Sequence, residues 1–580
     1  MIKTLSKSIR EYKKETILSP IAVIAEVIFE SIMPFLVANM VTKIERGSTL
    51  DEIVKDGIII LIIAFFALVS GALAGKWASA ASTGFSKNLR SDMFKNIQKF
   101  SFGNINKFSS SSLVTRMTTD VTNVQMAYML IVRAAFRFPI MLVTSFVMAY
   151  VMGGKMAFIF LFTAPILAII LGIIISTVMP KFRAVFKRYD KLNNSIQENI
   201  KGIRVVKSYV HEAYEREKFD TAADELKTGF IGAERIIAIN TPVFELMLNI
   251  VMFFVLSVGS YVVITTRGTE FNVGQMSALL TYSWQILNAL MLLSMIFVML
   301  TIAQESARRI AEVLDEETDL QNPENPIYEV KDGSVSFKNV SFSYESVDKC
   351  EDLCGVNLEI KSGETVGIIG STGSSKSTLV QLIPRLYDVD HGSVKVGGVD
   401  VRNYDLKTLR DEVALVLQKN ILFSGTVREN LKWGDHEATD EEIIEATKLA
   451  QAHNFIMEFE DGYDTYIEQG GSNVSGGQKQ RISIARSLLK KPKILILDDS
   501  TSAVDTKTDA LIRHGLMNYL PNTTKIIIAQ RIASVEEADK IIVLADGRIE
   551  SIGTHEELLE SSDMYKEIYE SQTKVGDDYE

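Results

Sequence analysis

The sequence has 580 residues, of which 47% are hydrophobic, and a formal net charge of −11 at pH 7. This length exceeds one ordinary domain, and the negative charge argues against a nucleic-acid partner. The two cysteines, Cys350 and Cys354, are too few for a disulfide framework, and we expect free thiols. Apolar runs long enough to cross a bilayer occur only in the first half, so the sequence predicts a membrane part followed by a soluble part.

The first 303 residues have the pattern of a membrane domain. Residues 1–16 are basic and amphipathic, and we expect a helix on the inner membrane surface. Apolar segments of about 20 residues follow, and they predict six transmembrane helices at 17–41, 57–80, 128–152, 156–179, 242–266 and 276–303. Lys and Arg gather in 1–16, 81–127 and 180–240, so these segments and both chain termini are predicted to be cytoplasmic. The expected location is the cell membrane.

Two cytoplasmic segments, 86–100 and 187–219, have apolar residues at helical spacing. We expect the spans to continue as helices into the cytoplasm, with turns near 103–110 and 208–215 that could touch a cytoplasmic domain. The alternative is that these helices are merely solvated.

Several side chains in the predicted spans suit a substrate pathway. Acids inside a membrane often mark such a pathway, and a Met-rich, mildly polar helix face suits a promiscuous apolar pocket. The candidates are Glu26, Glu245, Trp284, Asn288, Met291, Met295 and Met299. Ordinary helix packing is the alternative for the methionines, which recur every fourth residue on one face.

The second half begins after a polar linker, 304–334, and ends in a short acidic tail, 573–580. Between them, 335–572 alternates strand-like and helix-like patterns, which predicts an α/β domain. The apolar strand TVGIIG leads directly into a loop and a helix, the context of a phosphate-binding loop. The loop residues are Gly370, Ser371, Thr372, Gly373, Ser374, Ser375, Lys376, Ser377 and Thr378. Lys376 would reach the outer phosphates and Ser377 would bind Mg²⁺.

Two further elements follow along the chain. An apolar strand, KILILD, ends in Asp498, which suits Mg²⁺, and Asp499 follows at a position that suits polarising a water. Upstream, NVSGGQ places Ser475, Gly476, Gly477 and Gln478 at the start of a helix, where backbone N–H groups suit a γ-phosphate. An ordinary helix cap is the alternative for SGGQ, but its place between the phosphate-binding loop and the acidic strand argues against that.

This set of motifs resembles the ATP-binding cassette (ABC) exporter family, and in particular a bacterial multidrug half-transporter. The resemblance covers nearly the whole chain and includes ESIMP at 30–34 and MTTDV at 117–121. It implies a six-helix membrane domain fused to an α/β ATPase domain that binds ATP and Mg²⁺. It also implies that Tyr344 stacks on adenine, that Gln418 senses Mg²⁺ and that Asp505 lies in a loop at the dimer interface. Each ATP in this family lies between the phosphate-binding loop of one domain and the SGGQ signature of another.

Three positions depart from the family pattern. Asp499 stands where the family has Glu, Gln530 replaces the switch histidine and Ser375 replaces a glycine. A catalytic group misplaced by about 1 Å can cost roughly 100-fold in rate, and Gln cannot carry a proton near neutral pH. The signature is intact. The pattern resembles the degenerate-site subunit of a heterodimeric exporter, whose signature completes the active site of its partner.

The expected function is therefore ATP-driven export of small, amphipathic or drug-like molecules. The chain would act in the lipid bilayer with a second half-transporter, most simply as a heterodimer. The alternatives are a regulatory ATP-binding subunit, a lipid or peptide exporter, and a homodimeric exporter with slow hydrolysis.

Overall fold

The computed structural model describes residues 1–344, 352–500 and 504–577, without the side chains of 186, 187, 190, 302, 518 and 573–577. The chain divides into two compact units. The first comprises Met1–Lys99 with Ser109–Glu316, and the second comprises Phe100–Phe108 with Glu317–Glu580.

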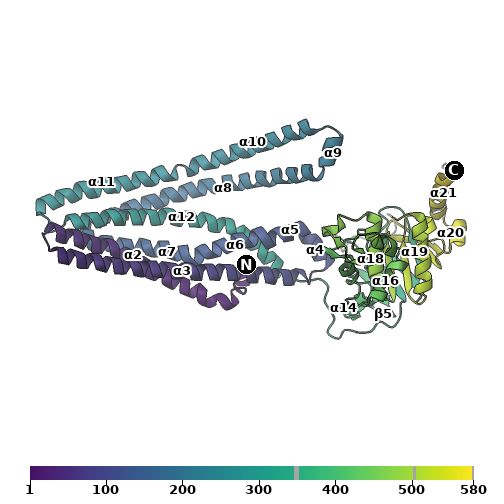
Figure 1. The fold of residues 1–580 in the computed structure, drawn as a ribbon. Helices are drawn as coiled ribbons and strands as arrows, with labels where there is room; N and C mark the ends of the chain where they lie inside the picture. Colours follow the sequence, from purple (N-terminus) through teal and green to yellow (C-terminus); the bar gives the residue numbers. More distant parts are fainter. Residues whose placement is uncertain (345–351, 501–503, 578–580) are drawn as a thin grey trace. The chain divides into compact units, whose positions relative to one another are not determined.

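The first unit is helical (Figure 1). Its helices are α1 (Ile2–Ser6), α2 (Lys13–Glu45), α3 (Leu50–Ile97), α5 (Ser110–Thr115), α6 (Val121–Met129), α7 (Ala135–Gly153), α8 (Ile159–Lys201), α9 (Ile203–Ser208), α10 (Glu212–Ile237), α11 (Asn240–Thr266) and α12 (Val273–Asp315). Two π-helical turns, Arg116–Asp120 and Leu130–Ala134, lie on either side of α6.

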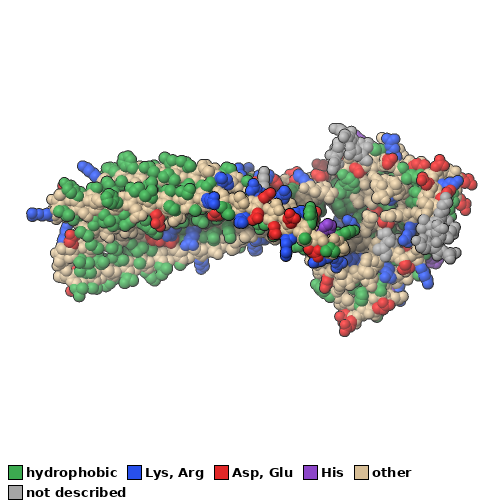
Figure 2. Space-filling view, turned by 90° about the horizontal axis from the view of Figure 1, so that it is seen from above, with side chains coloured by type: hydrophobic (Ala, Val, Ile, Leu, Met, Phe, Trp, Pro, Cys, Tyr) green, Lys and Arg blue, Asp and Glu red, His purple; other side chains and the backbone are tan. Residues whose placement is uncertain are grey.

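Within the described residues, five helical stretches are long and apolar enough to cross a membrane. One of them, 110–185, contains two of the predicted spans, because the chain reverses at Gly154, whose φ is +51°, and α7 and α8 run in opposite directions (Figure 1). Hydrophobic side chains cover much of the surface of this unit, with Lys and Arg near its ends (Figure 2). The predicted helical membrane domain is therefore confirmed.

The N-terminal arm packs on α3. The Ser8 hydroxyl donates to Asp92 at 2.7 Å, and Arg10 pairs with the same carboxylate at 2.5 Å. The ring of Tyr12 lies directly on Gly84, since a Cβ built at Gly84 would be 2.2 Å from the Tyr12 ring. The arm is therefore anchored where α3 has no side chain.

A buried acid ties the first π-turn to α12. Asp120 is fully buried, and its Oδ1 accepts hydrogen bonds from Ser306 at 2.8 Å and Arg309 at 2.5 Å. Among the described residues, Asp120 Oδ2 has no hydrogen-bond partner. The carboxylate therefore depends on Arg309 for most of its compensation.

The second unit is built on a six-stranded sheet of order β12-β11-β3-β10-β9-β6. Its strands are β3 (Thr365–Ile369), β6 (Val413–Val416), β9 (Ile494–Asp498), β10 (Thr524–Ile528), β11 (Lys540–Ala545) and β12 (Arg548–Gly553), of which only β12 is antiparallel to its neighbour. An antiparallel sheet of β1 (Val335–Phe342), β2 (Leu353–Ile360), β4 (His391–Val396) and β5 (Val399–Asp400) and a pair β7 (Gly425–Thr426) and β8 (Tyr466–Ile467) complete it.

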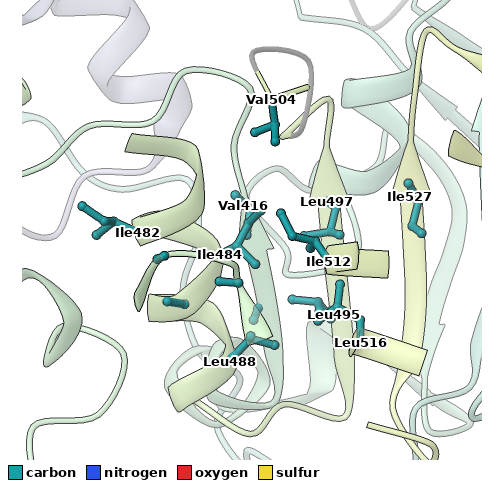
Figure 3. Packing of buried hydrophobic residues seen from close by; sticks show 14 of the residues in the cluster. Val416, Ile482, Ile484, Leu488, Leu495, Leu497, Val504, Ile512, Leu516 and Ile527 are labelled. Atoms are coloured by element: carbon teal, nitrogen blue, oxygen red, sulfur yellow. The ribbon is translucent and has the colours of Figure 1, made fainter. Parts of the chain in front are cut away.

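The helices of this unit are α4 (Phe102–Phe108), α13 (Lys376–Gln381), α14 (Leu406–Glu412), α15 (Val427–Leu431), α16 (Asp440–Leu449), α17 (His453–Met457), α18 (Gly476–Leu489), α19 (Thr506–Tyr519), α20 (His555–Ser561) and α21 (Asp563–Asp577). Every residue of β3, β9 and β10 is buried, as expected for parallel strands covered on both faces. Figure 3 shows Ile484 and Leu488 of α18 packed near Leu495 and Leu497 of β9. The predicted α/β domain is confirmed.

Helix α4 belongs to the second unit although it follows α3 in the chain. The ring of Phe102 lies 6.1 Å from that of Tyr387, and Asn106 donates to the Tyr387 hydroxyl at 3.3 Å. The predicted turn near 103–110 thus does contact the α/β domain, whereas at the turn near 208–215 Tyr209 and Val210 are exposed.

The expectation of free thiols is wrong for Cys354, which is disulfide-bonded. Cys350 lies outside the described residues.

Candidate nucleotide-binding site

The phosphate-binding loop connects β3 to α13 and curls around a lysine. Lys376 Nζ donates to the carbonyls of Gly370 at 2.8 Å and Ser371 at 2.7 Å, and to the Ser374 hydroxyl at 3.2 Å. Gly370 is required sterically, since a Cβ there would lie 2.2 Å from the carbonyl oxygen of Leu544. Burial lowers the pKa of Lys376, and the charges of Asp499 and Asp498 oppose that shift. The lysine therefore closes a ring of backbone within this loop.

Ser375 departs from the family pattern in a way that affects the backbone. Its φ of +68° and ψ of 26° are left-handed, the conformation that glycine adopts without penalty. An L-residue pays about 1–2 kcal/mol for it. The loop thus keeps the left-handed conformation although the backbone of Ser375 is strained.

Ser377 and Asp498 come together as the sequence predicts. The Ser377 hydroxyl donates to Asp498 Oδ1 at 2.9 Å, and Asp498 is buried at the end of β9. Burial raises the pKa of Asp498, while the Ser377 hydrogen bond opposes the rise. A hydroxyl and a carboxylate oxygen are hard donors that fit Mg²⁺, with phosphate oxygens and waters as the remaining ligands.

Asp499 lies at the meeting point of two amide side chains. Its Oδ2 accepts from Gln530 Nε2 at 2.9 Å and from Gln418 Nε2 at 3.2 Å. Asp499 is 8% exposed and has a φ of +46°. The structure therefore brings together the two candidate catalytic residues and the candidate Mg²⁺-sensing glutamine.

Tyr344 is half-exposed beside the loop. Its hydroxyl donates to Thr378 Oγ1 at 3.3 Å, and its ring meets those of Phe342 at 5.0 Å and Tyr387 at 5.1 Å edge to face. Tyr344 is 45% exposed, which leaves ring surface that suits stacking on a base. Sequence reasoning missed Tyr387, whose signal was an aromatic residue at the end of the loop's helix segment, TLVQLIPRLY.

The signature residues begin α18. Ser475 accepts from the Gln478 amide at 3.3 Å, and the Gln478 side chain accepts from the Ser475 amide at 2.9 Å, which is a capping box. Ser475 and Gly476 are exposed. Among the described residues, no hydrogen bond joins this segment to the phosphate-binding loop. Asp505 caps α19 by accepting from Thr508 at 2.8 Å.

The candidate pathway residues of the membrane unit are not brought together by any contact described here. Glu26 is buried on α2 and pairs with Arg137 at 2.5 Å, and Arg137 also pairs with Glu30 at 2.8 Å. Glu245 is exposed on α11. Trp284, Met295 and Met299 on α12 are exposed, and Asn288 and Met291 are half-buried. Their assignment to a substrate pathway stays a prediction.

Two family models match the chain. The model of the ABC transporter transmembrane region matches residues 16–290, and the model described as ABC transporter matches residues 353–502. The uncharacterized ABC transporter ATP-binding protein YfiB of Bacillus subtilis is 37% identical over 98% of this chain and 98% of its own length. The ATP-dependent lipid A-core flippase of Desulfotalea psychrophila is 30% identical over 99% of each chain.

A solved structure has the same fold. A bacterial Atm1-family ABC exporter with ATP bound superposes with a TM-score of 0.83, covering 97% of this chain and 99% of its own, at 23% sequence identity. At this identity the likeness shows the architecture, an exporter-type membrane domain fused to an ATPase domain.

Proposed function

This chain belongs to the ABC transporter family as a half-transporter of the exporter type, and from that premise we propose that it is the degenerate-site subunit of a heterodimeric exporter. Membership of the family makes it a multi-pass membrane protein whose ATPase domain uses ATP and Mg²⁺ to drive transport. The proposal adds that its own hydrolytic residues are impaired, whereas its signature completes the site of a partner subunit.

The observation that carries this proposal is the contrast between the two sets of residues. The carboxylate of Asp499 is buried and held by the side-chain amides of Gln530 and Gln418, neither of which exchanges a proton near neutral pH. The signature helix, by contrast, is capped, and Ser475 and Gly476 are exposed. A damaged acid and an intact, accessible signature support a subunit that contributes to catalysis mainly through its partner's site.

Each nucleotide-site residue then has a distinct part in the proposal. The outer phosphates are held by Lys376 and the loop backbone. Mg²⁺ is held by Ser377, Asp498 and Gln418. Adenine stacks on the ring of Tyr344. Ser475 and Gly477 face the γ-phosphate bound to the partner, and Asp505 lies at the subunit interface. The short distance between Ser377 and Asp498 and the ring of bonds around Lys376 support these assignments.

The transported molecule is proposed to be small and amphipathic. Met291, Met295 and Met299 follow one face of α12, and Met295 and Met299 are exposed on the membrane unit, which supports a flexible apolar wall. A lipid is a second candidate, because one full-length relative is a lipid A-core flippase. The chain would lie in the cell membrane with both termini in the cytoplasm and the domain division 1–16, 17–303, 304–334, 335–572 and 573–580.

A comparison of two substitutions in the assembled dimer tests the proposal. Ser475→Arg puts bulk and a buried charge where the partner's γ-phosphate lies, so it should abolish most ATP turnover. Asp499→Asn changes a position that is already impaired, so most turnover should remain. Steady-state ATPase rates of both variants, with assembly checked by size, give the answer.

Equal damage from the two substitutions would make Asp499 a working catalytic acid, and a symmetric homodimer would then replace the heterodimer. Full ATP turnover with no transport in reconstituted vesicles would favour a regulatory subunit instead.

A further inference from the structure

A pocket of about 280 Å³ lies between α2 and α3, near the short connection that joins them. It is lined by Leu36, Asn39, Thr42, Lys43, Arg46, Asp56 and Ile59. The α2 residues follow one face of the helix at spacings of three and four. A polar group on a membrane helix is costly unless it is satisfied. The Thr42 hydroxyl already donates to the Ala38 carbonyl at 2.8 Å and lies 3.0 Å from Asn272 Oδ1, so Asn39 and Arg46 are the groups that call for an occupant.

The charges of the pocket favour an anion. Lys43 is paired, with Nζ 2.7 and 3.0 Å from the two carboxylate oxygens of Asp56. Within the described part of the chain, the guanidinium of Arg46 makes no ion pair or hydrogen bond, although its backbone N–H donates to the Thr42 carbonyl. The side-chain amide of Asn39 likewise has no partner there. One excess positive charge and two sets of unused donors therefore face this space. The planar guanidinium suits a phosphate, which it can bind through two parallel hydrogen bonds.

The remaining walls of the pocket are apolar. Leu36 lies ten residues before Arg46, which is about 15 Å deeper along a helix, and Ile59 faces the pocket from α3. On α3, the neighbouring Ile58, Leu61 and Ile62 are also exposed, in a segment that spans the bilayer. A ligand with a phosphate near Arg46 and a hydrocarbon chain beside α3 would match both parts.

We propose that this pocket binds the phosphate headgroup of a phospholipid at the membrane surface where α2 and α3 are joined. Arg46 and Asn39 contact the phosphate, Lys43 stays paired with Asp56 and adds its field, and the acyl chains lie along the exposed face of α3. The site is separate from the nucleotide-binding site and does not depend on which subunit hydrolyses ATP.

Photolabelling of the full-length assembled transporter tests the site. The protein is reconstituted into phosphatidylcholine nanodiscs that contain a photoreactive phosphatidylglycerol, and labelled peptides are mapped. Label should appear within residues 36–62. Arg46→Gln should lower it about tenfold, because one charge-assisted hydrogen-bonding group is lost. Lys55→Gln is the matched control, since Lys55 is exposed close by but does not line the pocket, and it should leave labelling unchanged.

Three outcomes would overturn the proposal. Labelling that is absent from residues 36–62 in the wild-type chain would mean that a partner subunit or nothing covers the pocket. An equal loss in Arg46→Gln and Lys55→Gln would reduce the effect to general surface charge. Displacement of the label by millimolar inorganic phosphate would assign the pocket to a soluble phosphate compound rather than a lipid. Assembly size and detergent-phase melting, unchanged in Arg46→Gln, separate a binding loss from misfolding.

Discussion

At the scale of single residues, Ser375 offers the sharpest prediction. Its left-handed backbone, with φ at +68°, costs about 1–2 kcal/mol that glycine does not pay. Ser375→Gly should therefore tighten binding of a fluorescent ATP analogue by roughly fivefold or more. A titration of the purified full-length protein measures it.

The matched control, Gly373→Ser, should have the opposite effect on nucleotide affinity. Gly373 has φ at +86° with nothing within 4 Å of a built Cβ, so Gly373→Ser adds backbone strain without a steric clash and should weaken nucleotide binding. Tighter binding in both variants would mean that loop strain does not govern affinity here.

The motifs placed the candidate nucleotide-site residues along the chain, because phosphate-binding chemistry demands fixed local spacings, and their roles stay a prediction. They could not give the hydrogen bonds from Gln418 and Gln530 to Asp499, since these three side chains come from segments that only the sheet brings together. Tyr387 was missed for the same reason: its value lies in contacts with Tyr344 and Phe102, which are distant in sequence.

At the scale of elements, adjacent arginines on α12 should differ sharply. Arg309 compensates the fully buried Asp120, while Arg308 pairs with Glu305 and Glu312 on the exposed face. Arg309→Gln should destabilise the membrane unit by about 1–3 kcal/mol, because a buried charge loses its partner. Arg308→Gln should cost much less, because exposed ion pairs contribute little to stability.

Thermal unfolding in detergent, followed by tryptophan fluorescence, compares the two variants. Similar melting temperatures would show that the buried Asp120 does not depend on Arg309, and that the link between the π-turn and α12 is weak.

The helical elements of the membrane unit were predictable from length and hydropathy, with one weak point. The third predicted span, 128–152, contains Arg133 and Arg137 near its start, and charged residues weaken a hydropathy signal. The structure accounts for Arg137, which is paired with Glu26 and Glu30 of α2. A hydropathy scale treats each charged residue in a span as unfavourable. It cannot show that an arginine and a carboxylate on two different helices will pair with each other. The π-turns beside α6 leave no pattern in composition at all.

At the scale of the whole molecule, the chain alone should be a poor ATPase. Under the proposed function, a single chain carries one set of impaired hydrolytic residues, so a homodimer would pair two impaired sites. We expect turnover well below about 1 s⁻¹ for the chain purified without a partner. Robust, cooperative hydrolysis by this chain alone would instead require Asp499 and Gln530 to work as they stand.

The order of membrane and ATPase domains was readable from the sequence, since apolar spans and phosphate-binding motifs occupy different halves. The bounds of the two compact units could not be read in this way, because Phe100–Phe108 belongs to the ATPase unit although it lies within the membrane half of the sequence. No division of the chain by composition can assign such a short segment, because its membership is set by contacts such as that between Asn104 and the carbonyl of Glu317, 3.1 Å apart.

The place of Phe100–Phe108 in the ATPase unit matters when that domain is produced as a separate fragment. A fragment that begins at Glu317 lacks nine residues of the ATPase unit, Phe100–Phe108, because they precede it in the chain. The vacated surface would expose Tyr387, whose ring also supports Tyr344. Nucleotide affinities measured on such a fragment would describe a truncated protein rather than the domain as it occurs in the chain. Supplying 100–108 as a peptide, or splicing it back on a linker, would be the way to restore the missing piece.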